Sequence, residues 1–320
     1  MQIVCYVSFF VPVHNAGAEV MLYEMMLAMV NKGHKVTVIS DDATINYYKC
    51  MDCIRTADIA RVKKVVSQCD VVITHLINTQ KAIKYAKRYN KPIVHILHND
   101  KQIFKRQITN SNSDLIIANS QWIYDTIKLD TKKMIIHPAI DINKYEVQTN
   151  GEAIVLINLI KVKGAELFYQ LAELMPEYKF IGVRGGYLVN RQIVPQDLPP
   201  NVEILPNTPN IQEVYKRAKI VLMPSEAESW GKVAIEACCS GIPVIANKTA
   251  GLTESLGNAG IFIDVNQPLL WVKKIKSLYR NQSFYTRRSN LCKKRAIELE
   301  LIYKKQIEEL NNNLEEIVRG

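Results

Sequence analysis

Residues 219–245 read KIVLMPSEAESWGKVAIEACCSGIPVI, in which a short apolar run is followed by a loop, a helical pattern and a second apolar run. The runs Lys219–Met223 and Pro243–Ala246 have the near-continuous apolar character of strands that are buried on both faces. Between them, a helix is expected to open near Gly231. A strand, a helix and a strand in this order predict a parallel βαβ unit.

The same alternation recurs along the whole chain. In the first half, further strands are predicted at Ile3–Phe9, Lys35–Ile39, Asp70–Thr74, Pro92–Leu97, Asp114–Ala118 and Met134–Ile136. In the second half, they are predicted at Ala153–Leu159, Lys179–Val183, Val202–Leu205 and Gly260–Ile263. Two such series predict an α/β protein with two doubly wound parallel-sheet domains.

A polar stretch, EVQTNGE at 146–152, is the predicted linker between the two series. The first domain is therefore expected at 1–147 and the second at 148–299. Past Gln267 the pattern is helical to the end, and we expect a C-terminal helix at 300–320 to pack back on the first domain. Its apolar stripe consists of Leu299, Ile302, Ile307, Leu310, Leu314 and Ile317.

The composition is that of a folded protein of two domains. Of the 320 residues, 48% are hydrophobic and 22% are charged, which excludes disordered, collagen-like and disulfide-scaffold classes. The apolar start of the chain reads as a strand and not as a signal peptide, and no run is long enough for a transmembrane helix. The seven cysteines are an odd number without framework spacing, so a reducing cytoplasm is the expected location.

Two carboxylates stand out in the opening stretch, because Glu228 precedes the predicted helix and Glu236 lies inside it. Backbone N–H groups at the start of a helix have no partner within the helix and can bind an anion. Ser229, Trp230 and Gly231 occupy that position. The arrangement is suited to a phosphorylated sugar, although a capping glutamate followed by a surface glutamate would give the same two residues.

The whole stretch resembles the Glu-x7-Glu signature of the retaining glycosyltransferases of family 4, which have the GT-B fold. The Pro-Ser before Glu228 and the Gly-Ile-Pro-Val-Ile at 241–245 belong to the resemblance. It implies two Rossmann-like domains facing a central cleft, with a nucleotide-sugar donor bound by the second. It also implies that Glu228 orients the sugar hydroxyls and that Glu236 holds the ribose.

Segments of the first half match the same family in the same order. Residues 12–19, PVHNAGAE, resemble its first glycine loop, in which Gly17 would let the backbone approach a ligand, and Ala16 replaces the usual first glycine. His98 follows the strand Pro92–Leu97, where the family usually has a histidine near the transferred sugar.

The second domain carries the expected donor site. Residues 158–164, NLIKVKG, resemble the family segment whose arginine and lysine bind the donor diphosphate. Lys163 retains the lysine, whereas Asn158 stands where arginine is usual and supplies no charge. Arg184 follows another strand and could reinforce the phosphate site, and Asn207 falls where the family holds the nucleotide base. A surface arginine and a turn residue are equally open interpretations of these two.

Several other signals are absent from the sequence. It has no Gly-x-Gly-x-x-Gly for a nicotinamide dehydrogenase and no Walker loop. There is no Asp-x-Asp or His-x-x-x-His cluster, so no metal and no cofactor are expected beyond the nucleotide sugar as co-substrate. Cys50 and Cys53 lack a second pair at zinc-site spacing.

The net charge of +10 bears on partners, because residues 81–106 carry eight lysines and arginines against one acid, Asp100. We expect a retaining glycosyltransferase whose acceptor is an envelope lipid or saccharide, with this basic segment at the anionic inner leaflet. One alternative is transfer to a modified nucleic-acid base, with nucleic acid bound at 81–106. Alternatives from another class are a nucleotide-sugar epimerase and a non-catalytic nucleotide-sugar-binding protein. Solvated helix faces would explain the charge equally well.

Overall fold

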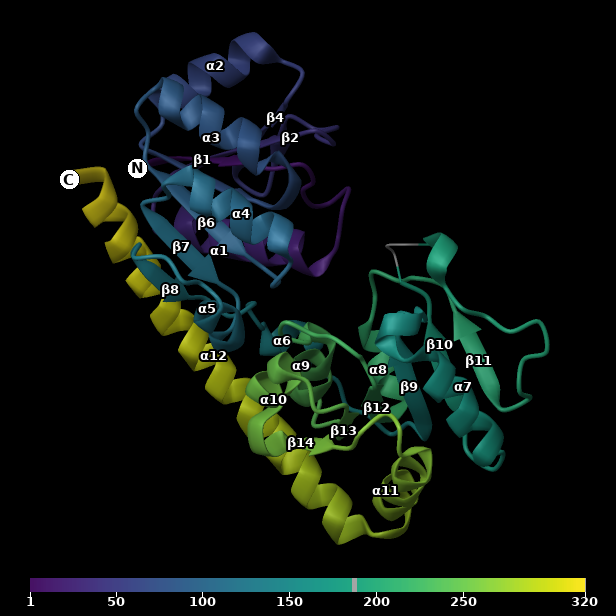
Figure 1. Cartoon of the computed structure of the whole chain (residues 1–320). Helices are drawn as coiled ribbons and strands as arrows, with labels where there is room; N and C mark the ends of the chain where they lie inside the picture. The colour runs from purple at the N-terminus through teal and green to yellow at the C-terminus, as the bar shows by residue number, and fades with distance from the viewer. Residues whose placement is uncertain (186–188, 320) are drawn as a thin grey trace. The chain divides into compact units, whose positions relative to one another are not determined.

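The computed structural model describes residues 1–185 and 189–319, which form two compact units (Figure 1). Unit 1 comprises Met1–Ala139 and Ile302–Gly320, and unit 2 comprises Ile140–Leu301. Unit 2 begins before the polar stretch 146–152, because residues at and just before the start of that stretch are hydrogen-bonded within unit 2. Ser240 Oγ donates to the carbonyl of Tyr145 at 2.8 Å, and the Val147 N–H donates to Ser240 Oγ at 2.9 Å.

Unit 1 is built on a sheet whose order across the described residues is β3-β4-β2-β1-β5-β6-β7-β8. Neighbours pair in parallel except β3 and β4. Strand order reverses between β1 and β5, the topological switch point beside which open α/β sheets bind ligands. The strands are β1 (Gln2–Tyr6), β2 (Lys35–Ser40), β3 (Tyr47–Tyr48), β4 (Met51–Arg55), β5 (Val71–His75), β6 (Ile93–Leu97), β7 (Leu115–Ala118) and β8 (Lys133–Ile135).

Helices cover both faces of this sheet. Apolar side chains of α1 (Gly17–Asn31) and α12 (Gln282–Arg319) share one buried cluster with β1, β2, β5 and β6. Those of α2 (Ile59–Gln68) and α3 (Thr79–Arg88) form the cluster on the opposite face. The remaining helical segments of the unit are η1 (Leu76–Asn78), α4 (Gln102–Ser111) and α5 (Gln121–Asp125).

The C-terminal helix packs on the first domain as its stripe predicts. Ile307, Leu310 and Leu314 are buried in the core that contains the methionines of α1. Polar contacts flank this seam, since His34 Nε2 lies 2.6 Å from Asn311 Oδ1 and Lys132 Nζ lies 2.6 Å from Glu316 Oε2. Residues from Ile302 onward therefore belong to unit 1.

Unit 2 has a wholly parallel sheet across its described residues, in the order β11-β10-β9-β12-β13-β14. This is the strand order of the Rossmann fold, with the switch point between β9 and β12. The strands are β9 (Ala153–Ile157), β10 (Phe180–Val183), β11 (Val202–Leu205), β12 (Ala218–Met223), β13 (Val244–Ala246) and β14 (Gly260–Phe262).

One buried cluster of unit 2 lies between its sheet and two helices, α7 (Ala165–Leu174) and α11 (Pro268–Arg280). Trp271 and Phe168 are fully buried in it. The other helical segments are α6 (Ile142–Tyr145), η2 (Lys161–Lys163), η3 (Val189–Arg191), α8 (Gln212–Arg217), α9 (Lys232–Cys239), α10 (Ala250–Leu256) and η4 (Gly257–Ala259). The predicted fold class, two Rossmann-like parallel-sheet domains, is confirmed.

Candidate functional site

The loops that follow β9 and β12 pack against each other at the switch point of unit 2. The Glu226 N–H donates to the carbonyl of Val162 at 3.0 Å. A side chain at Gly164, where φ is +85°, would place its Cβ 2.4 Å from Pro224 Cγ, so this contact requires glycine. The close packing fixes Lys163, one residue earlier, beside the β12 loop.

Lys163 forms an ion pair with Glu228, which brings together two residues that the sequence assigned to the donor site. Ser225 Oγ donates to the same carboxylate oxygen at 3.2 Å. The Lys163 and Glu228 side chains are only 27% and 12% exposed, so solvent shields the pair weakly. Since an ammonium has three N–H donors, Lys163 keeps donors for an anion while it is paired.

Asn158 follows β9 with φ of +74°, a left-handed conformation that asparagine adopts more readily than arginine. Its Oδ1 accepts a hydrogen bond from Gln192 Nε2 at 3.0 Å. Gln192 Oε1 in turn accepts from the backbone N–H groups of Leu159 and Gly185, each at 3.1 Å. Asn158 is thus part of a network that orders the loops. Gln192 was not identified from the sequence, because it is distant along the chain and matches no motif.

Arg184 and Asn207 follow the neighbouring strands β10 and β11. The Arg184 N–H donates to the carbonyl of Leu205 at 2.9 Å, and Asn207 Nδ2 lies 3.4 Å from the carbonyl of Arg184. Both side chains are exposed. The structure therefore lines up Asn207, Arg184, Asn158 and Glu228 along the carboxyl edge of one sheet, because they follow strands that are consecutive in the sheet order.

Trp230 and Gly231 lie just before α9, which begins at Lys232. Trp230 is only 3% exposed as a whole residue, so its indole packs inside unit 2. Gly231 is the N-cap residue with φ of +86°. The following helix α10 packs closely here, since a Cβ on Gly251 would lie 2.4 Å from the carbonyl oxygen of Glu228. Ser229, which lies between Glu228 and Trp230, is half-buried.

Glu236 in α9 accepts a hydrogen bond from the Tyr215 hydroxyl at 2.9 Å. Tyr215 is fully buried, and its burial together with the negative charge of Glu236 holds the pKa of the phenol well above its ordinary value. The tyrosine therefore remains a donor that orients the Glu236 carboxylate. It was not identified from the sequence.

In unit 1, the loop after β1 leads to Gly17 at the start of α1. A Cβ on Gly17 would meet no atom within 4 Å, so the space in front of this helix is open. Ala16 is the N-cap residue with φ of −98°, a conformation that does not require glycine. Glu19 in the first turn is buried, and burial raises its pKa.

His98 lies just past β6, and its Nε2 is 2.8 Å from Nδ1 of His75, the last residue of β5. Asn119 Nδ2 donates to the His98 carbonyl at 3.2 Å and anchors the backbone. Burial lowers the pKa of His98 to about 4 and that of nearby His95 to about 3. These rings are therefore neutral at neutral pH.

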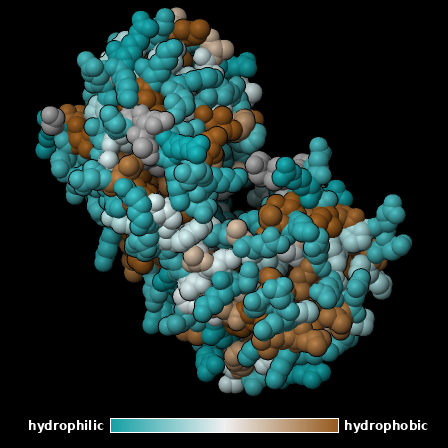
Figure 2. Space-filling model, in the orientation of Figure 1, coloured by the Kyte–Doolittle hydropathy of each residue, from teal (hydrophilic) through white to brown (hydrophobic). Residues whose placement is uncertain are grey.

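The basic segment 81–106 is divided between α3 and the region around α4. Lys81, Lys84, Lys87 and Arg88 are exposed on α3, as are Lys101 and Arg106 further on. Figure 2 shows mainly hydrophilic side chains over the region that α2, α3 and α4 cover in Figure 1. This surface is polar and positively charged.

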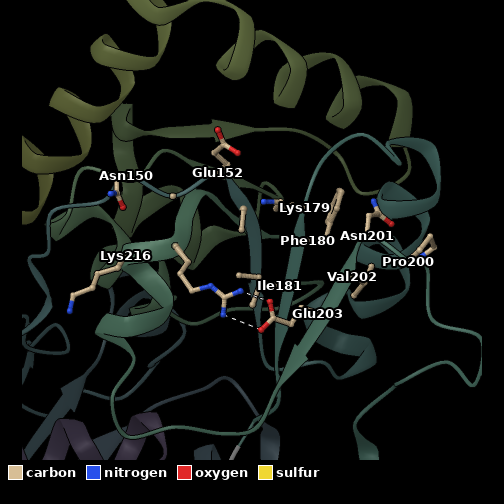
Figure 3. Close-up of a pocket in the computed structure, with 13 residues that line it drawn as sticks. Asn150, Glu152, Lys179, Phe180, Ile181, Pro200, Asn201, Val202, Glu203 and Lys216 are labelled. Carbon is tan, nitrogen blue, oxygen red and sulfur yellow. Dashed lines mark hydrogen bonds and ion pairs between the residues drawn. The ribbon is translucent and has the colours of Figure 1, made fainter.

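Unit 2 also contains a pocket of about 550 Å³ at the opposite edge of its sheet (Figure 3). It is lined by the first residues of three neighbouring strands, Ala153 of β9, Phe180 of β10 and Val202 of β11, and is crossed by an ion pair between Arg217 and Glu203. None of the residues assigned from the sequence lines it. Ligands of parallel sheets bind at the carboxyl ends, so this pocket is not the candidate donor site.

The part of the chain that the structure describes contains neither a metal-binding cluster nor a membrane-spanning helix. Across 1–185 and 189–319, no group of three or more His, Cys, Asp and Glu residues is arranged to hold a metal ion. In the same residues, no helix is long and apolar enough to span a membrane.

Comparisons of the sequence with protein families match most of its length. Residues 142–297 match the model described as glycosyl transferases group 1, and residues 15–144 match that of glycosyltransferase family 4. A D-inositol 3-phosphate glycosyltransferase from Paenarthrobacter aurescens (strain TC1) is 37% identical over 73 residues, which are 22% of this chain and 18% of that relative. The matched segment thus spans less than a fifth of the curated relative.

Solved structures resemble the chain over nearly its full length. The Anabaena HepE protein in complex with UDP-glucose has a TM-score of 0.80 at 19% identity, over 98% of this chain and 99% of that one. A sucrose-phosphate synthase from Thermosynechococcus elongatus has a TM-score of 0.79 at 15% identity, over 98% and 99%. At such identities the likeness establishes the shared fold.

Proposed function

Because the chain belongs to the family 4 glycosyltransferases of the GT-B fold, we propose that it transfers a sugar from a nucleoside-diphosphate sugar to a hydroxylated acceptor with retention of configuration. The observation that carries the proposal is the Lys163–Glu228 pair at the switch point of unit 2. It combines a cation for the diphosphate with a carboxylate for sugar hydroxyls. The similar HepE structure holds UDP-glucose, which supports a donor of this class.

The chemical task is to stabilise the charge that develops on the leaving diphosphate. Lys163 would donate to the phosphate oxygens, aided by the backbone N–H groups of residues 229–231 at the start of α9 and by Arg184. Glu228 would orient the sugar hydroxyls, and Glu236, aligned by Tyr215, would hold the ribose. Asn207 and Asn158 would supply uncharged hydrogen bonds to the nucleotide.

Retention implies that the acceptor oxygen arrives on the face from which the diphosphate leaves. The leaving phosphate would then take the acceptor proton, so we assign no protein residue as base. Neutral His98 would hydrogen-bond the sugar or the acceptor and would not supply a charge. Gly17 would allow a ligand to approach the backbone at the start of α1.

We expect the acceptor to be a saccharide or a lipid head group. A saccharide-like acceptor is supported by the curated relatives that are named D-inositol 3-phosphate glycosyltransferases. The exposed lysines of α3 would favour an acceptor presented at an anionic surface. We further propose that the enzyme works in the cytoplasm, without a metal ion or cofactor, so turnover should persist in EDTA.

The donor is tested by thermal shift with UDP-, GDP-, ADP- and TDP-sugars, since a ligand that binds only the native state raises its stability. Turnover of the selected donor is then followed by NMR, which also reports the anomeric configuration of the product. An inverted product would refute retention, and an epimer formed without acceptor would indicate an epimerase. Donor binding without turnover of any acceptor would indicate a binding protein.

The acceptor is tested with inositol phosphate, neutral saccharides, anionic vesicles and duplex DNA at several salt concentrations. We expect transfer to a saccharide or lipid, and vesicle binding that weakens in Lys84→Glu/Lys87→Glu. The control Lys273→Glu/Lys305→Glu makes the same change in net charge at other exposed positions. Equal loss in both would refute a specific role for α3, and transfer to DNA alone would favour the nucleic-acid alternative.

A further inference from the structure

Two histidines meet at the carboxyl edge of the unit 1 sheet, where His75 ends β5 and His98 follows β6. The two strands are neighbours, and their register pairs His75 with Ile96, two residues before His98. Nδ1 of His75 lies 2.8 Å from Nε2 of His98, and the rings meet edge to face with centroids 4.9 Å apart. Both side chains are buried.

The contact allows one proton between the two nitrogens, because a hydrogen bond needs one donor and one acceptor. If His75 donates, His98 carries its own proton on Nδ1. If His98 donates, its Nδ1 is a bare acceptor. The position of the shared proton therefore determines whether Nδ1 of His98 donates or accepts a hydrogen bond. Nδ1 of His98 has no hydrogen-bond partner among the described residues, which leaves it for a ligand.

The surroundings favour donation by His75. In the other arrangement, His75, which is only 1% exposed, would carry its proton on Nε2, and that atom makes no hydrogen bond to a described residue. In folded proteins a donor without a protein partner is less common than an acceptor without one. His95, the neighbouring imidazole, has no hydrogen-bond partner on either nitrogen and so does not compete for the shared proton.

We propose that His75 is a positioning residue that donates to Nε2 of His98 and thereby keeps His98 in the Nδ1–H form, as a hydrogen-bond donor to an oxygen of the bound sugar or acceptor. The hydrogen bond from His98 to the sugar or acceptor rests on the proposed function. The tautomer of His98 is a property of the free protein.

The tautomer is measured by long-range proton–nitrogen NMR on protein labelled with ¹⁵N-histidine, which has only six histidines to assign. We expect Nδ1–H for His98 in the wild type and in His75→Asn, whose amide can donate from the same position. In His75→Leu the single tautomer should be lost. His95→Leu, which removes an adjacent buried histidine without hydrogen bonds, should leave it intact. An Nε2–H tautomer in the wild type, or no change in His75→Leu, would overturn the proposal.

Kinetics test whether the effect passes through His98. His75→Leu should lower kcat about three- to tenfold, the range of one neutral hydrogen bond, while His75→Asn restores it. In a His98→Ala background, His75→Leu should cause no further loss. Independent losses would overturn the positioning role. If the wild type transfers no sugar at all, the proposed function fails, and the NMR result still decides the tautomer.

Discussion

The two units place different chemistry at the carboxyl ends of their parallel strands. At the switch point of unit 2, an ion pair joins Lys163 to Glu228. At the carboxyl ends of β5 and β6 in unit 1, a hydrogen bond joins two imidazoles, and burial keeps the pKa of each below its ordinary value. One edge presents fixed charge and the other presents neutral dipoles. An anionic diphosphate matches the first, whereas uncharged hydroxyls match the second.

The largest expected effect tests the charged edge. Lys163→Met removes the cation and leaves Glu228 to face the diphosphate alone. We expect kcat/KM for the nucleotide sugar to fall about 100- to 1000-fold, as on loss of one group that stabilises transition-state charge. Initial rates over a range of donor concentrations measure this fall.

Lys161→Met is the matched control for this variant. Lys161 lies two residues earlier, its side chain is 67% exposed, and it pairs with Glu166 at 3.3 Å. An exposed pair of this kind contributes little, so turnover should be unchanged. If both variants lose activity equally, the charged edge of unit 2 is not the donor site.

The second prediction tests the neutral edge through stability. The pKa of His95 is about 3 in the folded protein against an ordinary value of 6.5, so the unfolded state binds its proton first as pH falls. Protonation of His95 therefore does not lower the free energy of unfolding above pH 6.5, but lowers it progressively from pH 6.5 toward pH 3. His95→Leu removes this pH dependence. The free energy of unfolding of the variant should therefore exceed that of the wild type by a margin that grows by about 1.4 kcal/mol per pH unit below pH 6.

Urea unfolding followed through histidine ring signals measures this difference, because the histidines all precede residue 140 and so report on unit 1. The signals of His34 and His137 are present in both proteins. Parallel stability curves for wild type and His95→Leu between pH 7 and pH 4.5 would contradict a neutral buried histidine cluster.

Local patterns predict the strands well where both faces are buried. The apolar runs from Ile3 to Gly260 all become parallel strands. The strand β4 was missed because its sequence, MDCIR, includes Asp52 and Arg55 and so lacks a continuous apolar run. It lies near the sheet edge beside β2, where the short β3 is its other neighbour, and an edge tolerates polar residues.

The candidate site residues show the same difference between local sequence patterns and contacts of distant segments. Motifs predicted Lys163, Glu228 and His98, each of which follows a strand, and Glu236, which lies inside the helix of the Glu-x7-Glu pattern. The partners Tyr215, Gln192 and His75 were not identified, since their contacts depend on strand register and loop packing between distant segments. For His75 a signal did exist: it ends the strand that precedes the His98 strand, and in parallel sheets such residues meet at one edge.

A smaller effect is expected at Tyr215, which orients Glu236. Tyr215→Phe keeps the ring in the core but removes the hydrogen bond, so the carboxylate is held less firmly. We expect the donor KM to rise about three- to tenfold, equivalent to one hydrogen bond, with kcat little changed. Tyr279→Phe removes a tyrosine hydroxyl that donates to the backbone carbonyl of Glu152 in the same unit, away from α9. If Tyr279→Phe shifts the donor KM equally, Tyr215 has no specific role.

The smallest effect is expected at Gly17, and Gly251, near the start of a helix in the other unit, provides the comparison. A Cβ on Gly17 in α1 meets no atom within 4 Å, whereas a Cβ on Gly251 in α10 would lie 2.4 Å from the Glu228 carbonyl. Gly17→Ala should therefore raise the free energy of unfolding by about 0.5 kcal/mol, through the lower entropy of the unfolded chain. Gly251→Ala should lower it by about 1–3 kcal/mol, as overpacking does.

Activity separates the two reasons for keeping a glycine. If Gly17 is glycine so that a ligand can approach, Gly17→Ala must lower kcat/KM although the protein is slightly more stable, and urea unfolding with initial rates on the same preparation measures both. A stable and fully active Gly17→Ala would show that the open space before α1 admits no substrate. At Gly251, by contrast, activity and stability should fall together, because the contact that the methyl group disrupts is internal to unit 2.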